Sequence, residues 1–204
     1  MTKMTKDVYT DITGVILVGG KSSRMGFDKA FLKINGITLF EKVLLVFRKL
    51  FNKIILIGDE GKRFAAYGLE VYPDIYPGSA LGGLYTGLFY AETQYIFVSA
   101  CDMPFPSHIM IRHLVSGTEG FDVVVPQTPE GCEPLFAVYS KRCLGSMKGM
   151  LKSGNFRIYD FYPEVRTRYL VAAELFCPGS LRKALLNVNT PEELKQIRLE
   201  RGKK

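Results

Sequence analysis

The sequence has few residues from which a metal centre or a disulfide framework could be built. It contains two histidines, His108 and His113, and four cysteines that show no C-x-x-C spacing and have no histidine beside them. This pattern predicts neither a zinc site nor paired cysteines. We expect the cysteines to be free thiols, mostly buried, and the histidines to serve packing or solvent contact. The cysteines are Cys101, Cys132, Cys143 and Cys177.

Long apolar runs are also missing. No stretch approaches the roughly 18 to 20 apolar residues that a membrane helix needs, and the N-terminus lacks the apolar region of a secretory signal. The sequence therefore predicts a cytoplasmic protein with no membrane contact. Its 204 residues, 47% of them hydrophobic, suit one domain or two small ones. We expect a single domain, residues 1–204.

Acidic residues are fewer than basic ones, with 20 Asp and Glu against 27 Lys and Arg, a formal net charge of +7. Part of this surplus lies at the two termini, where charge is usually solvated. The dense basic face with interleaved aromatic residues that is typical of nucleic-acid binders is not found. The charge predicts an ordinary solvated surface or the binding of anionic small molecules, and no nucleic acid.

Apolar, β-branched runs alternate along the chain with patterns of helical period. Thr38 and Glu41 form a capping box, and apolar residues follow them at helical spacing. Strands are expected at 12–18, 53–58, 69–74, 95–102, 121–125 and 135–139. Helices are expected at 38–51, 62–68, 82–91 and 107–114, and from residues 141 and 190. Residues 155–176 are expected to hold a strand and irregular structure.

Such alternation predicts an α/β fold. We expect a three-layer, α/β/α, Rossmann-like architecture with a mainly parallel central sheet. In sheets of this kind, ligands bind outside the carboxyl ends of the strands. The ends of the expected strands are therefore the first places to look for functional residues.

The first strand ends in Gly19-Gly20. A glycine pair lets the backbone approach a ligand closely, and exposed N–H groups suit a phosphate chain. The segment matches neither the phosphate loop G-x-x-x-x-G-K-[ST] nor the dinucleotide turn G-x-G-x-x-G. A plain turn would also explain the glycines, but Arg24 and Lys29 follow closely, and both can neutralise phosphate oxygens. The loop is predicted to cradle a phosphate-bearing ligand.

The segment "SACDMPF" places Asp102 directly after the most apolar strand. A carboxylate there should project from the carboxyl edge of the sheet. Mg²⁺ is typically held by one or two carboxylates together with substrate phosphates, so Asp102 is a candidate metal ligand. The alternative is that Asp102 caps the following helix. Glu133, before Pro134, has two interpretations as well, a contact with a second substrate or the end of a turn, and the turn is slightly favoured.

Five segments, taken in order, resemble the motifs of the molybdenum cofactor guanylyltransferases, within the nucleotidyltransferases of the nucleotide-diphospho-sugar transferase fold. The resemblance runs from about residue 14 to residue 194, and the first motif is the most specific. The segments are "LVGGKSSRMGFDK", "GSALGGLYTGL", "VSACDMPF", "EPLFAVYS" and "NVNTPEEL".

The resemblance implies roles for individual residues. Arg24 and Lys29 match the arginine and lysine that are expected on the triphosphate, and Asp74 matches an aspartate near the nucleotide. Asp102 matches the aspartate that binds Mg²⁺. Asn187 and Asn189 match the segment that faces the pterin or the metal. The strand end expected to contact the guanine nucleotide comprises Leu17, Val18, Gly19 and Gly20.

The resemblance also implies a reaction. The terminal phosphate of molybdenum-molybdopterin would attack the α-phosphorus of GTP, releasing pyrophosphate and giving the guanine dinucleotide form of the cofactor. Transient contact with proteins that insert or accept the cofactor is implied as well. Two alternatives stay open: another nucleotidyltransferase of this fold that uses CTP or a sugar phosphate, and a nucleotide-binding adaptor without catalysis.

Overall fold

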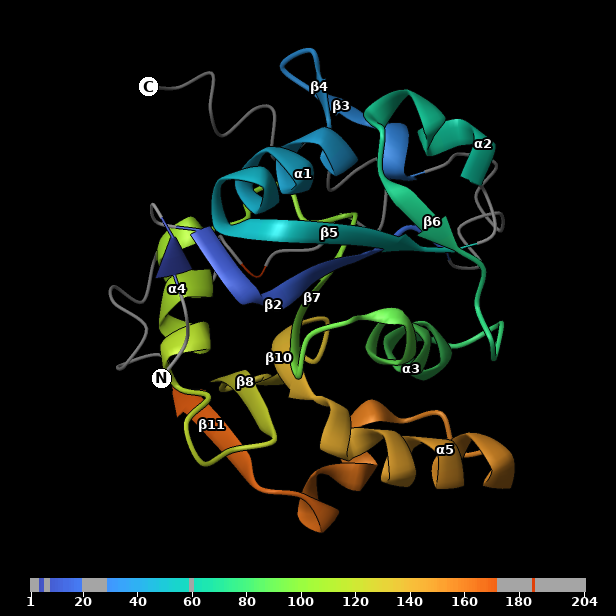
Figure 1. The fold of residues 1–204 in the computed structure, drawn as a ribbon, viewed down its shortest axis with the longest axis vertical. Coiled ribbons are helices and arrows are strands. Elements are labelled where there is room, and N and C mark those ends of the chain that lie inside the picture. The colour runs from blue at the N-terminus through green and yellow to red at the C-terminus, as the bar shows by residue number, and fades with distance from the viewer. Residues whose placement is uncertain (1–3, 6–7, 20–28, 59–60, 172–184, 186–204) are drawn as a thin grey trace.

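The computed structural model describes residues 4–5, 8–19, 29–58, 61–171 and 185 (Figure 1). Its strands are β1 (Met4–Thr5), β2 (Val8–Leu17), β3 (Lys33–Ile34), β4 (Ile37–Thr38), β5 (Phe51–Ile57), β6 (Glu70–Tyr72), β7 (Tyr95–Ala100), β8 (Val123–Thr128), β9 (Gly131–Cys132), β10 (Phe136–Ser140) and β11 (Thr167–Val171). Its α-helices are α1 (Leu39–Leu50), α2 (Gly61–Phe64), α3 (Ala80–Tyr90), α4 (His108–Ser116) and α5 (Leu144–Ser153). Short 3-10 helices are η2 (Lys29–Phe31), η3 (Ala65–Tyr67), η4 (Lys141–Cys143) and η5 (Ile158–Glu164).

The main sheet has the strand order β11-β8-β10-β7-β2-β5-β6, with β1 and β9 attached to β2 and β8. Parallel pairing joins β7, β2, β5 and β6, and it also joins β11 to β8. β10 is the exception on this path, because it pairs antiparallel with both of its neighbours. The expected α/β fold with a mainly parallel sheet is confirmed.

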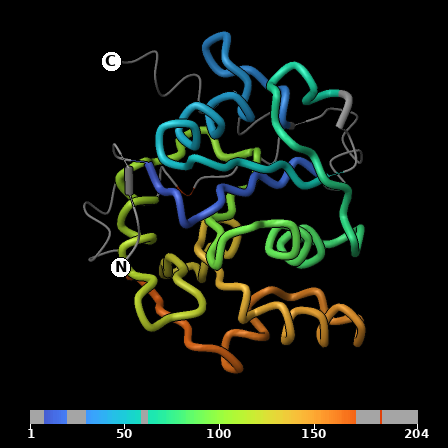
Figure 2. Tube along the Cα trace, in the orientation of Figure 1, coloured from blue at the N-terminus to red at the C-terminus, as the bar shows by residue number. Residues whose placement is uncertain are grey.

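Helices cover both faces of the sheet. In Figures 1 and 2, α1 and α2 lie on one side of the strands, and α3 and α5 lie on the other. The alternation of β2 explains the two cores: Ile12 and Ile16 join the core beneath α1 and α4, whereas Val15 and Leu17 join the core beneath α3 and α5. The three layers predicted from the sequence are therefore present.

The capping box predicted at the start of α1 is formed. Thr38 Oγ1 accepts a hydrogen bond from Glu41 N at 3.1 Å, and Thr38 N donates to Glu41 Oε2 at 2.8 Å. Behind this cap, α1 buries its apolar stripe in the core. The local signal and the tertiary packing agree here, so both ends of the helix were predicted to within a residue.

Glycine lets α3 lie close to the sheet. A Cβ atom built on Gly87 would lie only 2.7 Å from Val15 Cγ1, so the helix could not keep this position with a larger residue there. Glycine is a poor helix former, and the cost is offset because the middle of α3 is almost entirely buried. The helix expected at residues 82–91 is therefore real despite its glycines.

The remaining expectations have mixed outcomes. Residues 155–176 were expected to hold a strand and irregular structure, and η5 and β11 occupy the described part of that range. Cys132 and Cys143 are free thiols, with Cys143 buried and Cys101 half-buried, whereas Cys177 lies outside the described residues. The terminal helix expected from residue 190 lies outside them too. Among the described helices, none is long and apolar enough to span a bilayer.

Candidate active site

The carboxyl ends of β2, β5, β6 and β7 meet at one edge of the sheet, because these four strands run parallel. Gly19 follows β2, Gly58 follows β5, Asp74 follows β6 and Asp102 follows β7. The antiparallel strand β10 starts at the same edge, so Glu133 lies there as well. The strand-end rule therefore brings the described candidate residues to one place.

The end of β2 is held by hydrogen bonds on both sides. Leu17 O accepts from Cys101 N at 3.3 Å, and Val18 N donates to Ile57 O at 2.9 Å. Leu17 is buried and Val18 is half-buried, whereas Gly19 is exposed. Gly19 is thus the first residue of this segment whose backbone is open to a ligand.

Gly58 supports Gly19 from the neighbouring strand. A Cβ atom built on Gly58 would lie 2.7 Å from Gly19 N, and the φ angle of Gly58 is +154°, which L residues rarely adopt. Gly58 N donates to Tyr72 O at 3.0 Å, which ties the end of β5 to β6. The two strand ends can approach this closely because both residues are glycine.

Asp74 points its carboxylate between Gly19 and the first turn of α3. A Cβ atom built on Gly83 would lie 3.4 Å from Asp74 Oδ1, and one built on Gly19 would lie 3.8 Å from Asp74 Oδ2. The next residue, Ile75, donates its N–H to Thr86 Oγ1 at 3.0 Å, which fixes the segment against α3. A carboxylate in this position can accept hydrogen bonds from N–H or O–H groups of a ligand at the glycine edge.

The turn before α3 is shaped by Ser79 and Gly82. Ser79 caps the helix, because its Oγ accepts from Gly82 N at 3.0 Å. A Cβ atom on Gly82 would lie 1.8 Å from Tyr76 O, so no larger side chain fits. These contacts hold the Asp74 segment in place.

Asp102 lies two residues beyond the end of β7, and its Oδ1 atom is buried. The alternative interpretation, that Asp102 caps the next helix, is wrong. The N-cap of α4 is Ser107, whose Oγ accepts from Met110 N at 3.3 Å. Asp102 therefore lies at the carboxyl edge of the sheet and does not cap α4.

Glu133 lies at the same edge as Asp102, near enough for the charge of Asp102 to act on its carboxyl. Its backbone carbonyl accepts from Phe136 N at 3.2 Å and closes a turn, as the favoured sequence interpretation had it. Burial of the side chain, together with the neighbouring Asp102 carboxylate, raises the pKa of the Glu133 carboxyl to about 7, whereas a hydrogen bond from the Leu135 backbone lowers it. The sequence carried only a weak signal for this proximity, since it depends on an antiparallel strand pairing.

The structure leaves several candidate residues untested. Gly20, Arg24, Asn187 and Asn189 lie outside the described residues, and of Lys29 the description covers only the backbone, at the start of η2. The described part of the loop around the glycine pair thus ends at Gly19.

The described donor set fits a hard divalent cation. Across the described ranges no group of three or more His, Cys, Asp or Glu side chains is placed to hold a metal. Asp102 and Glu133 nevertheless offer two neighbouring carboxylates, and Mg²⁺ at nucleotide sites needs only one or two, with phosphate oxygens and water completing its shell.

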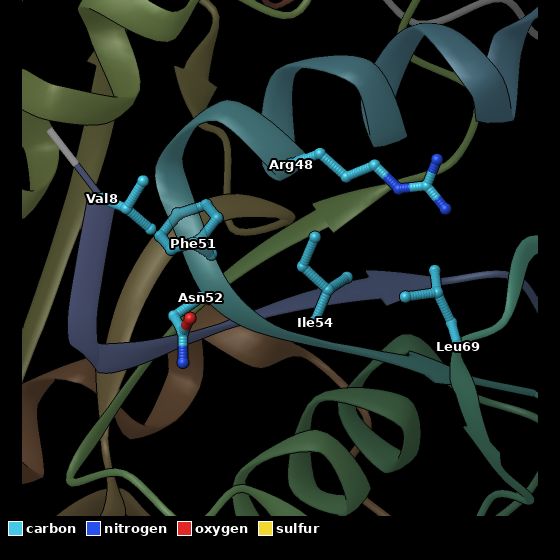
Figure 3. A pocket seen from close by; sticks show the side chains of 6 residues that line it. All are labelled: Val8, Arg48, Phe51, Asn52, Ile54 and Leu69. Carbon is cyan, nitrogen blue, oxygen red and sulfur yellow. The ribbon is translucent and has the colours of Figure 1, made fainter. Parts of the chain in front are cut away.

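A separate pocket of about 360 Å³ lies away from this edge (Figure 3). Val8 and Phe51 line it, and they are the first residues of β2 and β5. The pocket therefore opens at the amino ends of the parallel strands, opposite the carboxyl ends. Its lining residues are Val8, Arg48, Phe51, Asn52, Ile54 and Leu69.

Comparison with known proteins identifies the family to which the chain belongs. A family model described as MobA-like NTP transferase domain matches residues 14–165. The chain is 37% identical over 188 residues to a probable molybdenum cofactor guanylyltransferase of Pelotomaculum thermopropionicum, with 92% of each chain covered. It is 33% identical over 188 residues to the molybdenum cofactor guanylyltransferase of Desulfosudis oleivorans, with 91% of this chain and 93% of that protein covered.

One solved structure shows the same fold. The crystal structure of molybdopterin-guanine dinucleotide biosynthesis protein A from Archaeoglobus fulgidus superposes with a TM-score of 0.81. The superposition covers 95% of this chain and 100% of that chain at 22% sequence identity. At this sequence identity the likeness is one of fold.

Proposed function

The chain belongs to the family of MobA-like NTP transferases that includes the molybdenum cofactor guanylyltransferases, and from this premise we propose that it transfers GMP from GTP to the terminal phosphate of molybdenum-molybdopterin. The observation that carries the proposal is the 33% to 37% identity, over nine-tenths of the chain, to relatives that bear this name. The gathering of Gly19, Asp74 and Asp102 at one sheet edge supports it.

The proposed reaction is a displacement at phosphorus. An oxygen of the acceptor phosphate forms a bond to the α-phosphorus of GTP, and the bond from that phosphorus to the oxygen leading to the β-phosphate breaks. Pyrophosphate leaves with the electron pair. The acceptor phosphate is largely dianionic at neutral pH, since its second pKa is about 6, so no protein group has to remove a proton. Catalysis then depends on alignment and charge neutralisation.

Each candidate residue has a place in this proposal. The Gly19 backbone and the Asp74 carboxylate hold the nucleotide, Arg24 and Lys29 neutralise the triphosphate, and Asp102 holds a divalent cation. Enzymes of this family normally need such a cation, and Mg²⁺ is the one we expect. When bound, the cation neutralises charge that develops on the phosphates and on the leaving group. Asn187 and Asn189 are proposed to face the pterin or the metal.

The domain organisation, the location and the partners are proposed on the same basis. We propose a single nucleotidyltransferase domain over residues 1–204, a cytoplasmic location, and transient contact with proteins that insert or accept the cofactor. The basic surplus would favour the arrival of anionic substrates. No nucleic acid and no membrane takes part in the proposed reaction.

Two measurements test the function. Thermal unfolding in the presence of Mg²⁺ and each of GTP, CTP, ATP and UTP should show stabilisation by GTP; stabilisation by CTP alone would overturn the choice of base and favour a cytidylyltransferase. Pyrophosphate release should then require both GTP and molybdenum-molybdopterin. Protein that binds GTP but releases no pyrophosphate with this acceptor would support the adaptor alternative instead.

A further inference from the structure

The start of β10 brings a second carboxylate to the end of β7. The two strands pair antiparallel with Phe136 opposite Ser99, and Ala100 N donates to Leu135 O at 3.1 Å. The chain leaves both strands at this point: Asp102 lies in the turn two residues after Ala100, and Glu133 lies two residues before Leu135, in the turn that leads into β10. The electrostatic effect of Asp102 on the Glu133 carboxyl agrees with this proximity.

The backbone around Glu133 is fixed from several sides. Glu133 N donates to Pro126 O at 3.1 Å, which attaches the residue to β8. The carbonyl of Pro134 accepts from Tyr139 Oη at 2.8 Å, and that hydroxyl lies 2.7 Å from Tyr162 Oη in the core. These hydrogen bonds hold the backbone of Glu133 in a defined position, and a ligand-binding side chain needs such support.

The charges of the two substrates limit the roles that the Glu133 carboxylate can have. The proposed reaction brings a triphosphate and a phosphate monoester to the edge where Asp102 lies, and all of these groups are anionic. When ionised, a second carboxylate at that point would repel both substrates unless a cation lies between them, and a bound cation favours the ionised form of the carboxyl. Carboxylate oxygens are hard donors, which suit Mg²⁺ or Mn²⁺.

We propose that Glu133 is a second protein ligand, beside Asp102, for the divalent cation of the transfer reaction, an inference that rests on the proposed function. The strand order places Glu133 on the side of β7 that is opposite the nucleotide residues. β2, β5 and β6, which carry the glycine edge and Asp74, lie on one side of β7, and β10 lies on the other. Glu133 would thus bind the cation from the side opposite the nucleotide residues.

Binding of Mn²⁺ alone tests this without either substrate. The protein is titrated with MnCl₂, and free Mn²⁺ is measured by its EPR signal. We expect Glu133→Gln and Asp102→Asn each to weaken Mn²⁺ binding by about tenfold or more, since even the loss of a residue that only orients a ligand costs that much. Glu130→Gln is the matched control, because it removes the same charge from the exposed tip of the same β8–β9 hairpin. It should bind Mn²⁺ as the parent protein does.

Two further readouts separate a ligand from a distant charge. Water-proton relaxation of the Mn²⁺ complex should show an added bound water in Glu133→Ala, because this side chain has no oxygen and water takes the open position. Glu133→Asp keeps the charge but shortens the side chain, and it should also weaken binding. Circular dichroism and the thermal midpoint without metal check the fold of each variant.

The outcomes are decisive in both directions. The inference is overturned if the parent protein binds no Mn²⁺, if Glu133→Gln binds it as tightly as the parent, or if binding weakens while the number of bound waters stays the same. Unchanged Mn²⁺ binding with a raised KM for the acceptor would assign Glu133 to the acceptor instead. Guanylyl transfer is assayed separately, so its absence in the parent protein contradicts the proposed function and leaves the Mn²⁺ result standing.

Discussion

The backbone of Gly58 lies against that of Gly19, close enough that a Cβ atom on Gly58 would lie 2.7 Å from Gly19 N. Gly58→Ala should therefore displace the end of β2 and weaken GTP binding by about tenfold, through backbone strain of roughly 1–3 kcal/mol. Gly68→Ala is the control, since Gly68 also has a positive φ, of +66°, but a Cβ atom there meets nothing within 4 Å. Calorimetric titration with GTP measures both. Equal losses in the two variants would contradict the role of the close approach.

Alanine substitutions at two helical glycines distinguish the effect of packing on the free energy of unfolding from the effect of helix propensity. Gly82→Ala puts a methyl group against the backbone of Tyr76 and should lower the free energy of unfolding by about 1–3 kcal/mol. Gly149→Ala, in α5, meets nothing within 4 Å and should raise it by about 0.5–1 kcal/mol, because alanine is the better helix former. Urea denaturation compares the two. A stabilised Gly82→Ala variant would show that the turn before α3 adapts easily.

The capping box predicts a change in stability that depends on pH. Thr38→Ala should cost about 1 kcal/mol at pH 7, since it removes the cap of α1. The backbone N–H of Thr38, which alanine keeps, is the main cause that lowers the pKa of Glu41 below its ordinary value of 4.5, and the hydrogen bond from the Thr38 hydroxyl lowers it further. A lowered pKa in the folded state adds stability above pH 4.5, and that contribution is lost as the pH falls through the folded pKa. As the pH falls below 4.5, the difference between the parent and Thr38→Ala should therefore shrink by the part that the hydroxyl contributes, which denaturation at pH 7 and at a series of lower pH values checks.

The buried tyrosine pair makes Tyr139→Phe costly. Because Tyr139 Oη donates to Pro134 O, the proton between the two hydroxyls must come from Tyr162. Removing the Tyr139 hydroxyl takes a hydrogen-bond partner from both Pro134 O and Tyr162 Oη. The free energy of unfolding should therefore fall by about 1–3 kcal/mol. Tyr159→Phe, at an exposed position, should change it little. A double-mutant cycle with Tyr162→Phe measures the coupling, and purely additive effects would contradict it.

The sequence predicted best those features that depend on neighbouring residues or on strand direction alone. The Thr38 capping box needs only local contacts, and parallel strands necessarily bring Gly19, Asp74 and Asp102 to one edge. Two features could not be read in this way. The position of Glu133 depends on the antiparallel pairing of β10, and the choice between cap and site residue for Asp102 depended on Ser107 capping α4. Both are set by tertiary structure.

The two aspartates at the edge should affect different kinetic constants. Asp74 lies between Gly19 and Gly83, on the nucleotide side, so Asp74→Asn should raise the KM for GTP by about tenfold or more, the loss expected for hydrogen bonds to a charged group. Asp102 lies where the cation is proposed, so Asp102→Asn should mainly lower kcat, because the cation acts on charge that develops in the transition state. Glu164→Gln, exposed on η5, is the control for a lost charge. Steady-state pyrophosphate release at varied GTP measures all three. A KM effect confined to Asp102→Asn, with kcat lowered only in Asp74→Asn, would reverse the two assignments, since the residue after β7 would then bind the nucleotide and the residue after β6 would act in the transition state.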